Sequence, residues 1–325
     1  MKVSLILTVL NEGDHIRRLL DSVVKQSRRP DEVVVCDGGS RDNTVAVIQE
    51  YADRLPLKIL SAPGANISQG RNAAIRAATG DVIAVTDAGV WLEEKWLEEL
   101  AGQLSAISDQ LSVISDQSSV LVAGFYHSDP RNAFEAALGA TTMPEASEIN
   151  PAKFLPSSRS VAFRKSAWEA VGGYPEWLDY SEDVVFDLKM REKFGAFAFA
   201  PKAVAHFRPR GSLKAFAKQY FNYAKGDGKA NLFPKIHFVR YLTYLVAAPL
   251  GIYAAVTVSP WLWLLGVIAG LAYVRRPLQK LAGRRPFAAM LWVPVIRVTG
   301  DVAKMIGYPA GVWWRLTRWK DSSTD

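Results

Sequence analysis

Hydrophobic and polar positions along the first hundred residues alternate between two periods. Short apolar runs rich in Val, Ile and Leu predict strands at about 3–9, 33–37, 57–60 and 81–86. The segments between them repeat apolar residues at helical spacing and predict helices over 14–26, 44–53 and 66–79. This alternation of strands and helices predicts parallel β-α-β units, and therefore an α/β fold.

The mixed pattern continues to about residue 230. It predicts strands at 120–125 and 159–164, and helices over 131–139, 165–171, 182–194 and 212–226. Within this part, Ile-Ser-Asp-Gln occurs at 107–110 and again at 114–117. We interpret 105–118 as a duplicated surface loop insert, because a helix of two heptad turns is too short to stand alone.

A long apolar stretch follows. Tyr241–Val274 is 34 residues without a charged side chain, whereas one spanning helix needs about 20. Ser259-Pro260 lies near its middle, so we predict a hairpin of two short membrane spans, with a buried core hairpin as the alternative. Arg240 precedes the stretch and Arg275-Arg276 follow it, which predicts that both ends are cytoplasmic.

Residues 287–319 are also apolar, but they carry charges. Arg297, Asp301 and Lys304 are spaced to share one helix face, and four Trp occur in the same segment. We favour a helix that lies in the membrane interface over a third span. The predicted organisation is an α/β domain over 1–230 and a membrane region over 231–325.

Charge separates the two parts of the chain. Residues 1–200 carry 20 Lys and Arg against 28 Asp and Glu, whereas residues 201–325 carry 19 against 4. A basic tail suits nucleic acid or an anionic membrane, and the membrane-length apolar runs favour the membrane. The single Cys36 excludes an intrachain disulfide and a zinc site built from cysteines. We interpret Met1–Leu10 as a buried first strand and not as a signal peptide, because no cleavage site follows it.

Polar side chains stand where the predicted strands end. They are Thr8, Asn11 and Glu12 after the first strand, Asp37-Gly38-Gly39-Ser40 after the second, and Asp87 after the fourth. The carboxyl ends of parallel strands form the ligand edge of a sheet, so the sequence predicts a nucleotide site there. The chain has no G-x-G-x-x-G after the first strand and no G-x-x-x-x-G-K-[ST], which excludes a Rossmann dinucleotide site and a P-loop. Asn11-Glu12 suits capping of the helix over 14–26 equally well.

These side chains have the chemistry needed to bind the base, the ribose and the diphosphate of a nucleotide. A carboxylate such as Asp37 can accept from a uracil N–H or a ribose hydroxyl, and the glycines beside it permit close backbone approach. Arg71 is a candidate diphosphate contact, although a lone helical arginine is often a solvated charge. Asp87 could hold a divalent cation that bridges diphosphate oxygens.

Glu182 and Asp183 open a predicted helix. Carboxylates in a first turn suit the helix dipole, with Ser181 as a plausible N-cap. A carboxylate in this place can also act as the general base that takes a proton from an acceptor hydroxyl. The residues alone leave both interpretations open.

In combination these segments resemble the family 2 glycosyltransferases, which are inverting enzymes with the GT-A fold. The resemblance covers about residues 1–230. It rests on the order of the Thr-x-x-Asn-Glu opening, the Asp-Gly-Gly-Ser strand end, the Gly-Arg-Asn helix, the Asp-x-Asp region and the Glu-Asp pair. It implies a GT-A type nucleotide-binding sheet flanked by helices, followed here by the helical membrane region. It also implies sugar transfer from a nucleotide diphosphate, often uridine-based, to an acceptor hydroxyl or phosphate.

The resemblance assigns roles to the matching residues. Those expected to bind the nucleotide sugar are Thr8, Asn11, Glu12, Asp37, Gly39, Ser40, Arg71 and Asp87. Asp183 would be the catalytic base, and Glu182 would contact the acceptor or the sugar.

One position departs from the family pattern. Gly89 replaces the second Asp of Asp-x-Asp, which is the usual ligand of Mn²⁺ or Mg²⁺, so a bound divalent cation is expected but not assured. The best substitute is His206 at a strand end, because some GT-A enzymes use a histidine there. Asp87 and His206 would then be the metal ligands, with a purely structural histidine as the alternative.

The first hypothesis is a multi-pass cell-membrane glycosyltransferase with a cytoplasmic catalytic domain, acting in cell-envelope polysaccharide or glycolipid biosynthesis. Its partners would be a nucleotide-diphosphate sugar, membrane lipids and a lipid-linked or membrane-embedded acceptor, with no nucleic acid. The alternative is an inactive nucleotide-sugar-binding scaffold, which Gly89 favours. A nucleotidyltransferase would need a Gly-rich loop with a Lys after the first strand, and the chain has none.

Overall fold

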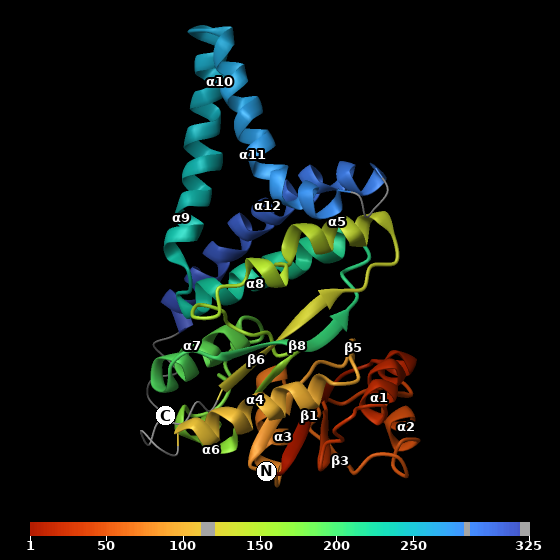
Figure 1. Ribbon diagram of the computed structural model, residues 1–325. Coiled ribbons are helices and arrows are strands. Elements are labelled where there is room, and N and C mark those ends of the chain that lie inside the picture. Colours follow the sequence, from red (N-terminus) through yellow and green to blue (C-terminus); the bar gives the residue numbers. More distant parts are fainter. Residues whose placement is uncertain (112–120, 283–286, 319–325) are drawn as a thin grey trace. The chain divides into compact units, whose positions relative to one another are not determined.

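The computed structural model describes residues 1–111, 121–282 and 287–318 (Figure 1). The chain divides into two compact units. Unit 1 comprises Met1–Ser128 and Pro144–Arg208, and unit 2 comprises Asp129–Met143 and Pro209–Asp325. Each unit has a hydrophobic core of its own. The predicted functional boundary at residue 230 stays a prediction.

Unit 1 is built on an eight-stranded sheet in the order β3-β2-β1-β4-β7-β6-β8-β5. The strands are β1 (Val3–Val9), β2 (Glu32–Asp37), β3 (Leu57–Ser61), β4 (Val82–Val85), β5 (Val90–Leu92), β6 (Leu121–Ser128), β7 (Val161–Arg164) and β8 (Ala198–Phe207). The first four pair in parallel. β7 runs antiparallel to β4 and β6, β8 runs parallel to β6, and β5 runs antiparallel to β8. The sheet is therefore mixed.

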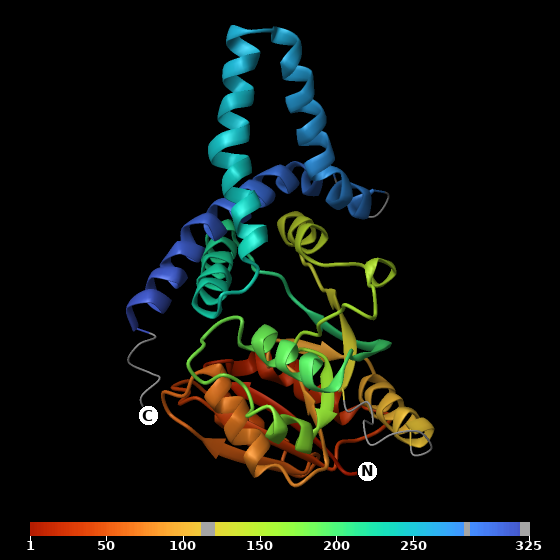
Figure 2. The ribbon, with the colours of Figure 1, turned by 90° about the vertical axis from the view of Figure 1, so that its left-hand side faces the viewer.

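Helices cover both faces of this sheet (Figure 2). One face packs on α1 (Ile16–Val24), α2 (Thr44–Gln49) and α4 (Trp96–Leu111), and the other on α3 (Ile67–Ala77), α6 (Lys165–Ala170) and α7 (Glu182–Phe194). The short 3-10 helices η1 (Gly13–His15) and η2 (Ala146–Glu148) lie in connections. In β1, Leu5 and Leu7 face the first layer and Ile6 the second. Burial on both faces explains why β1, β2 and β4 read as mainly apolar runs.

The structure confirms the predicted parallel β-α-β units for β1 to β4 and corrects one prediction. The segment 105–118 is not a loop from its start, because α4 continues to Leu111. Its first turns bury Trp96, Leu100 and Leu104 in the core, so the helix does not have to stand alone. Residues 112–118 lie outside the described residues.

Unit 2 is helical. Its elements are α5 (Ala133–Thr142), α8 (Leu213–Ala230), α9 (Pro234–Leu242), the π-helical turn η3 (Thr243–Ala247), α10 (Ala248–Thr257), the 3-10 turn η4 (Pro260–Leu262), α11 (Trp263–Leu281) and α12 (Phe287–Arg318). Phe134 of α5, Phe216 of α8, Leu281 of α11 and Ile296 of α12 share one buried cluster. This cluster ties a short segment near residue 140 to helices that follow it by about 80 residues or more.

The apolar stretch Tyr241–Val274 forms a helical hairpin whose turn follows Ser259 (Figure 2). Among the described residues, one helix, Pro234–Thr257, is long and apolar enough to cross a membrane by length and composition. Its apolar side chains are largely exposed, with Leu250 at 61%. Insertion of the hairpin as two spans and the interfacial placement of 287–319 stay predictions.

Candidate active site

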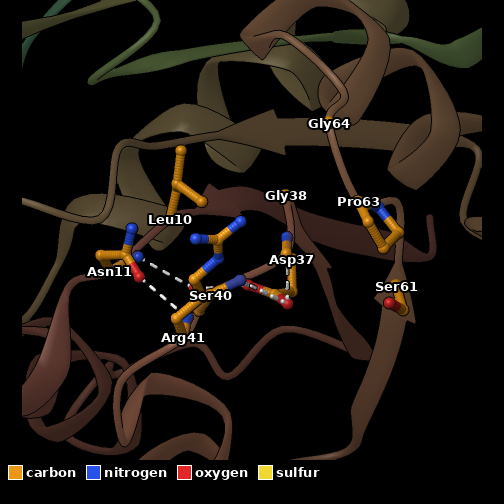
Figure 3. A pocket seen from close by; sticks show the side chains of 10 residues that line it. Leu10, Asn11, Asp37, Gly38, Ser40, Arg41, Ser61, Pro63 and Gly64 are labelled. Carbon is orange, nitrogen blue, oxygen red and sulfur yellow. Dashed lines mark hydrogen bonds between the residues drawn. The ribbon is translucent and has the colours of Figure 1, made fainter.

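A pocket of about 620 Å³ lies where β1, β2 and β3 end (Figure 3). Its lining residues are Leu10, Asn11, Asp37, Gly38, Gly39, Ser40, Arg41, Ser61, Pro63 and Gly64. They follow three neighbouring parallel strands at their carboxyl ends. This is the edge at which open α/β sheets bind ligands.

Hydrogen bonds fix the shape of this pocket (Figure 3). The Asp37 carboxylate accepts from the backbone N–H of Ser40 at 3.0 Å and from the Ser40 hydroxyl at 2.6 Å. The Ser40 hydroxyl in turn accepts from the N–H of Asn11 at 2.9 Å. Asn11 Oδ1 accepts from the N–H of Arg41 at 2.9 Å. The loops after β1 and β2 are thus tied together before any ligand arrives, which lowers the entropy cost of binding.

Two glycines permit close approaches around the site. Gly39 has φ of +97°, and a Cβ there would lie 3.1 Å from Cα of Pro63. A Cβ on Gly70 of α3 would lie 2.9 Å from Cγ2 of Thr8. Thr8 therefore packs directly against α3 and, contrary to the predicted contact with the nucleotide, is not among the residues that line the pocket.

Arg71 forms a buried bridge between two carboxylates. Its Nη1 donates to Oε1 of Glu182 at 2.7 Å, and its Nη2 donates to Oδ1 of Asp87 at 2.8 Å. Burial disfavours the charged guanidinium, but the two carboxylates outweigh burial and raise the pKa of Arg71. The side chain, 3% exposed, links the end of β4 to the first turn of α7. We call Arg71, Asp87 and Glu182 the Arg71 bridge.

Asn72, the next residue, holds the loop that leads into α7. Its Oδ1 accepts from the Tyr174 N–H at 2.9 Å and from Trp168 Nε1 at 3.1 Å, and its Nδ2 donates to the Tyr174 carbonyl at 2.8 Å. The loop ends at Ser181, which has φ of +62° and makes no side-chain capping hydrogen bond. Ser181 thus occupies the predicted N-cap position, but its side chain does not cap the helix. A non-glycine residue in this conformation costs about 1–3 kcal/mol and marks a position that the surrounding structure enforces.

The three carboxylates at the start of α7 differ in burial. Burial and the neighbouring Asp183 raise the pKa of Glu182 to about 7, against the opposing effect of Arg71. Burial and Asp183 also raise the pKa of Asp187, one turn further along α7, well above its ordinary value. Asp183 itself is half-buried, whereas the other two are buried. Of the three, Asp183 is the carboxylate that can reach a substrate.

The predicted metal ligands have other partners in this structure. Asp87 accepts from Arg71, and its Oδ2 lies 3.7 Å from Nε of Arg159. Nε2 of His206 lies 2.9 Å from Oε1 of Glu93. No group of three or more His, Cys, Asp or Glu side chains among the described residues could hold a metal ion. These residues do not fit a metal site built by the protein alone, and we derive no step through a cation.

The structure places the predicted site residues in two groups. Asn11, Asp37, Gly39 and Ser40 line the pocket. Arg71, Asp87 and Glu182 form the Arg71 bridge, with Asp183 next to it. Glu12 follows the lining residue Asn11 but does not line the pocket itself, and its backbone N–H donates to the Thr44 hydroxyl at 2.8 Å. The role of each residue stays a prediction.

Sequence reasoning missed part of this site. Ser61, Pro63 and Gly64 line the pocket, and a signal existed because they follow a predicted strand. Position along the chain assigned Pro156-Ser-Ser-Arg159 to the acceptor side of the site, and the structure brings Arg159 to 3.7 Å from Asp87. The buried Asp187 gave no local signal, because its burial depends on contacts between segments that are distant in the sequence.

The family model for Glycosyl transferase family 2 matches residues 4–168, which is slightly more than half of the chain. The chain belongs to glycosyl transferase family 2. The match begins in β1 and ends in α6, so it includes the pocket and both predicted donor-side carboxylates, Asp37 and Asp87. The family predicted from the sequence is confirmed.

The relatives of this family 2 chain match it either over a short segment or over its whole length at low identity. An uncharacterized glycosyltransferase of Nostoc sp. is 39% identical over 98 residues, and the match covers 29% of this chain and only 30% of that protein's length. The O-antigen chain rhamnosyltransferase RfbN of Salmonella typhimurium is 24% identical over 327 residues, which covers 97% of this chain and 91% of that protein.

A solved structure shares the fold of this family 2 chain. The mannosyltransferase PcManGT from Pyrobaculum calidifontis, in complex with GDP-Man and Mn²⁺, matches with a TM-score of 0.60 and 21% identity. The match covers 94% of this chain and 87% of that one. The α/β sheet with flanking helices is therefore the GT-A type that the resemblance implied.

Proposed function

We propose that this chain catalyses inverting transfer of a sugar from a nucleotide-diphosphate sugar, UDP-linked by our prediction, to a membrane-associated acceptor. The Arg71 bridge carries this proposal, because one buried side chain connects Asp87 at a strand end to Glu182 beside Asp183. A single displacement needs a base held at a fixed place relative to the donor, and the bridge supplies that geometry.

In this mechanism Asp183 takes the proton of the acceptor hydroxyl as its oxygen attacks the anomeric carbon. The bond between that carbon and the diphosphate oxygen breaks, and the nucleoside diphosphate leaves with the electron pair. Attack from the face opposite the leaving group inverts the anomeric centre. Arg159, next to Asp87, supplies positive charge for the departing diphosphate. A phosphate acceptor would attack with its own anionic oxygen and would need no base.

We place the acceptor at a membrane and the catalytic domain in the cytoplasm. The exposed apolar hairpin and the basic flanking residues support this placement. RfbN is by its name an O-antigen chain enzyme, which supports an acceptor from envelope polysaccharide or glycolipid synthesis. GDP-Man in the PcManGT complex makes a guanosine donor the nearest rival to UDP.

The Asp183→Asn variant tests this proposal. Asparagine keeps the size of the side chain but cannot accept the proton, so transfer should fall about 10²–10⁴-fold while nucleotide binding stays the same. Transfer of labelled sugar to a membrane lipid extract measures the first quantity. Thermal stabilisation by UDP, GDP or CDP, each with and without Mn²⁺, measures the second, and a nucleotide at about 100 times its dissociation constant adds about 2.7 kcal/mol.

The matched control is Asp179→Asn, an exposed aspartate in the loop before α7. It should leave both transfer and binding unchanged. Full turnover in the Asp183→Asn variant would remove Asp183 from the role of base. Stabilisation of the parent by a nucleotide without any transfer would instead favour the second candidate, an inactive nucleotide-sugar-binding membrane scaffold, which the missing ligand at Gly89 supports.

A further inference from the structure

Charged side chains converge in unit 2 where both arms of the hairpin meet α12. Asp301 of α12 accepts hydrogen bonds from Nε of Arg240 at 2.7 Å and from the Tyr244 hydroxyl at 3.0 Å. It also accepts from the Tyr273 hydroxyl on the opposite arm. The negative charge of Asp301 is thus already matched by Arg240, and its two oxygens are occupied by groups from both arms.

Two further cations on the same face of α12 have no carboxylate partner among the described residues. Arg297 donates from Nη2 and Nε to the Tyr273 carbonyl, at 2.6 and 3.1 Å, and its guanidinium lies 4.4 Å from the centroid of that ring. Nζ of Lys304 lies 4.6 Å from the centroid of the Tyr220 ring of α8 and has no hydrogen bond or ion pair within the described residues. Both side chains belong to partly buried residues. A desolvated cation without a counter-charge is costly, and such a site is typically completed by an anion.

The surroundings of Arg297 and Lys304 carry excess positive charge. The cations that act on this region are Arg240, Arg297 and Lys304, and the carboxylates are Asp301 and Asp227. Asp227 is engaged as well, since its Oδ2 lies 3.2 Å from Nε2 of His237. Among the Arg, Lys and Asp side chains of this region, three positive charges face two negative ones.

This cluster lies at the base of an apolar hairpin. Residues 245–272 contain no charged side chain, and their large side chains are exposed, with Trp261 at 77% and Leu271 at 61%. If the apolar part enters a bilayer, Tyr244 and Tyr273 at its base come to the depth of the lipid headgroups. Basic pockets between helices at that depth bind lipid phosphate groups.

We propose that Arg297 and Lys304 form a binding site for the phosphate of a membrane lipid that bears a phosphomonoester or a diphosphate. The aromatic rings of Tyr273 and Tyr220 hold the two cations in place without neutralising them, and the bound phosphate supplies the missing negative charge. To call this lipid the acceptor would rest on the function proposed above, whereas the binding itself does not.

The test measures binding of the full chain to phosphatidylcholine vesicles that contain phosphatidic acid or, at equal surface charge, phosphatidylglycerol. No nucleotide sugar is present, so failure of the glycosyltransferase proposal would leave the readout unchanged. We expect tighter binding to phosphatidic acid vesicles, because its phosphomonoester is unshielded. The double variant Arg297→Gln/Lys304→Gln should weaken that binding about 30-fold, at about 1 kcal/mol for each cation.

The control variant Lys214→Gln/Lys218→Gln removes the same charge from exposed positions of α8 and should keep the preference for phosphatidic acid. Equal losses in both double variants would reduce the effect to surface charge and overturn the proposal. Inorganic phosphate that abolishes the preference at millimolar concentration would overturn the assignment to a lipid. If the double variant fails to fold, Lys304→Met replaces it, and Lys304→Arg should restore the preference.

Discussion

Three neighbouring carboxylates at the start of α7 in unit 1 differ in burial, and burial raises the pKa of two of them. Glu182 and Asp187 are 6% and 3% exposed, and burial raises the pKa of each. Asp183 lies between them in sequence and remains half-buried. Two neighbouring carboxyl groups that bind protons more tightly than usual place less negative charge around Asp183, the base that we propose. The Glu182–Arg71 contact then serves to position α7.

The raised pKa of Glu182 makes folding stability depend on pH. The folded pKa of about 7 exceeds the ordinary 4.5, so the folded state binds the proton more tightly than the unfolded state. This contribution is fully present below about pH 4.5 and is lost as the pH rises through 7. The difference between the folded pKa of about 7 and the ordinary 4.5 corresponds to a change in folding free energy on the order of 3 kcal/mol. Glu182→Gln, which cannot titrate, should flatten the dependence of the melting temperature on pH between 5 and 8, a window chosen to bracket the folded pKa of about 7.

The pKa of Asp187 is raised as well, so the melting temperature of the Glu182→Gln variant should still depend on pH to some extent. The control is Glu192→Gln, an exposed position on the same helix, which should reproduce the parent profile. An unchanged pH profile in the Glu182→Gln variant would contradict the buried, proton-binding role of Glu182.

At the scale of elements, α8 and α12 are packed so closely that only glycine fits between them. A Cβ on Gly311 would lie 2.0 Å from the Lys225 carbonyl oxygen, and one on Gly307 would lie 2.2 Å from that of Phe221. On the opposite helix, a Cβ on Gly228 would lie 2.3 Å from the Tyr308 carbonyl oxygen. The clashing atoms belong to the backbone, so they cannot relieve the clash by rotating to another rotamer as a side chain would. Small residues at such spacing let helix backbones approach closely.

Gly311→Ala should therefore separate α8 from α12. We expect a loss of about 1–3 kcal/mol in the free energy of unfolding, because overpacking costs more than the gain in helix propensity of up to about 1 kcal/mol. Thermal unfolding in detergent measures the change. Gly266→Ala in α11 is the matched control, since a Cβ there meets no described atom within 4 Å, and it should be neutral or slightly stabilising. Equal stabilities of the two variants would contradict the close packing.

The sequence predicted the elements whose signal is local. The strands β1, β2 and β4 are buried on both faces, so each reads as a mainly apolar run with a polar group at or just beyond its end, whereas the edge strand β3 is only partly buried. β8 was harder to predict, because Pro201 interrupts its pattern, and β5 has only three residues. The pocket followed from the strand ends at Asn11 and Asp37. The Arg71 bridge did not, because it joins residues separated by 111 positions, and only the tertiary fold brings them together.

At the scale of the whole molecule, the composition of the chain changes near residue 200 from mainly acidic to strongly basic and apolar. Beyond it, 19 Lys and Arg accompany only 4 Asp and Glu, interleaved with long apolar runs. Pattern alone did not show that Asp129–Met143 belongs to the same unit as that tail. Phe134 and Leu138 of this segment complete a core with α8 and α12, and such long-range packing leaves no periodic signal.

The exposed apolar hairpin gives opposite predictions in water and in a bilayer. Leu250 lies near the middle of residues 241–257, the charge-free part of Pro234–Thr257, and is 61% exposed. In water, Leu250→Arg would remove an exposed apolar group and leave stability nearly unchanged. In a bilayer, arginine at the centre of a span costs about 3 kcal/mol, which is enough to keep the hairpin out of the membrane in most molecules.

We therefore expect Leu250→Arg to release the protein from membranes washed with alkaline carbonate. Leu250→Met, which keeps the volume and the apolar character, should stay in the pellet. Release of both variants and of the parent by the carbonate wash would place the hairpin outside the hydrocarbon. Since the basic tail alone could hold the chain to an anionic surface, the carbonate wash is the step that separates insertion from charge attraction.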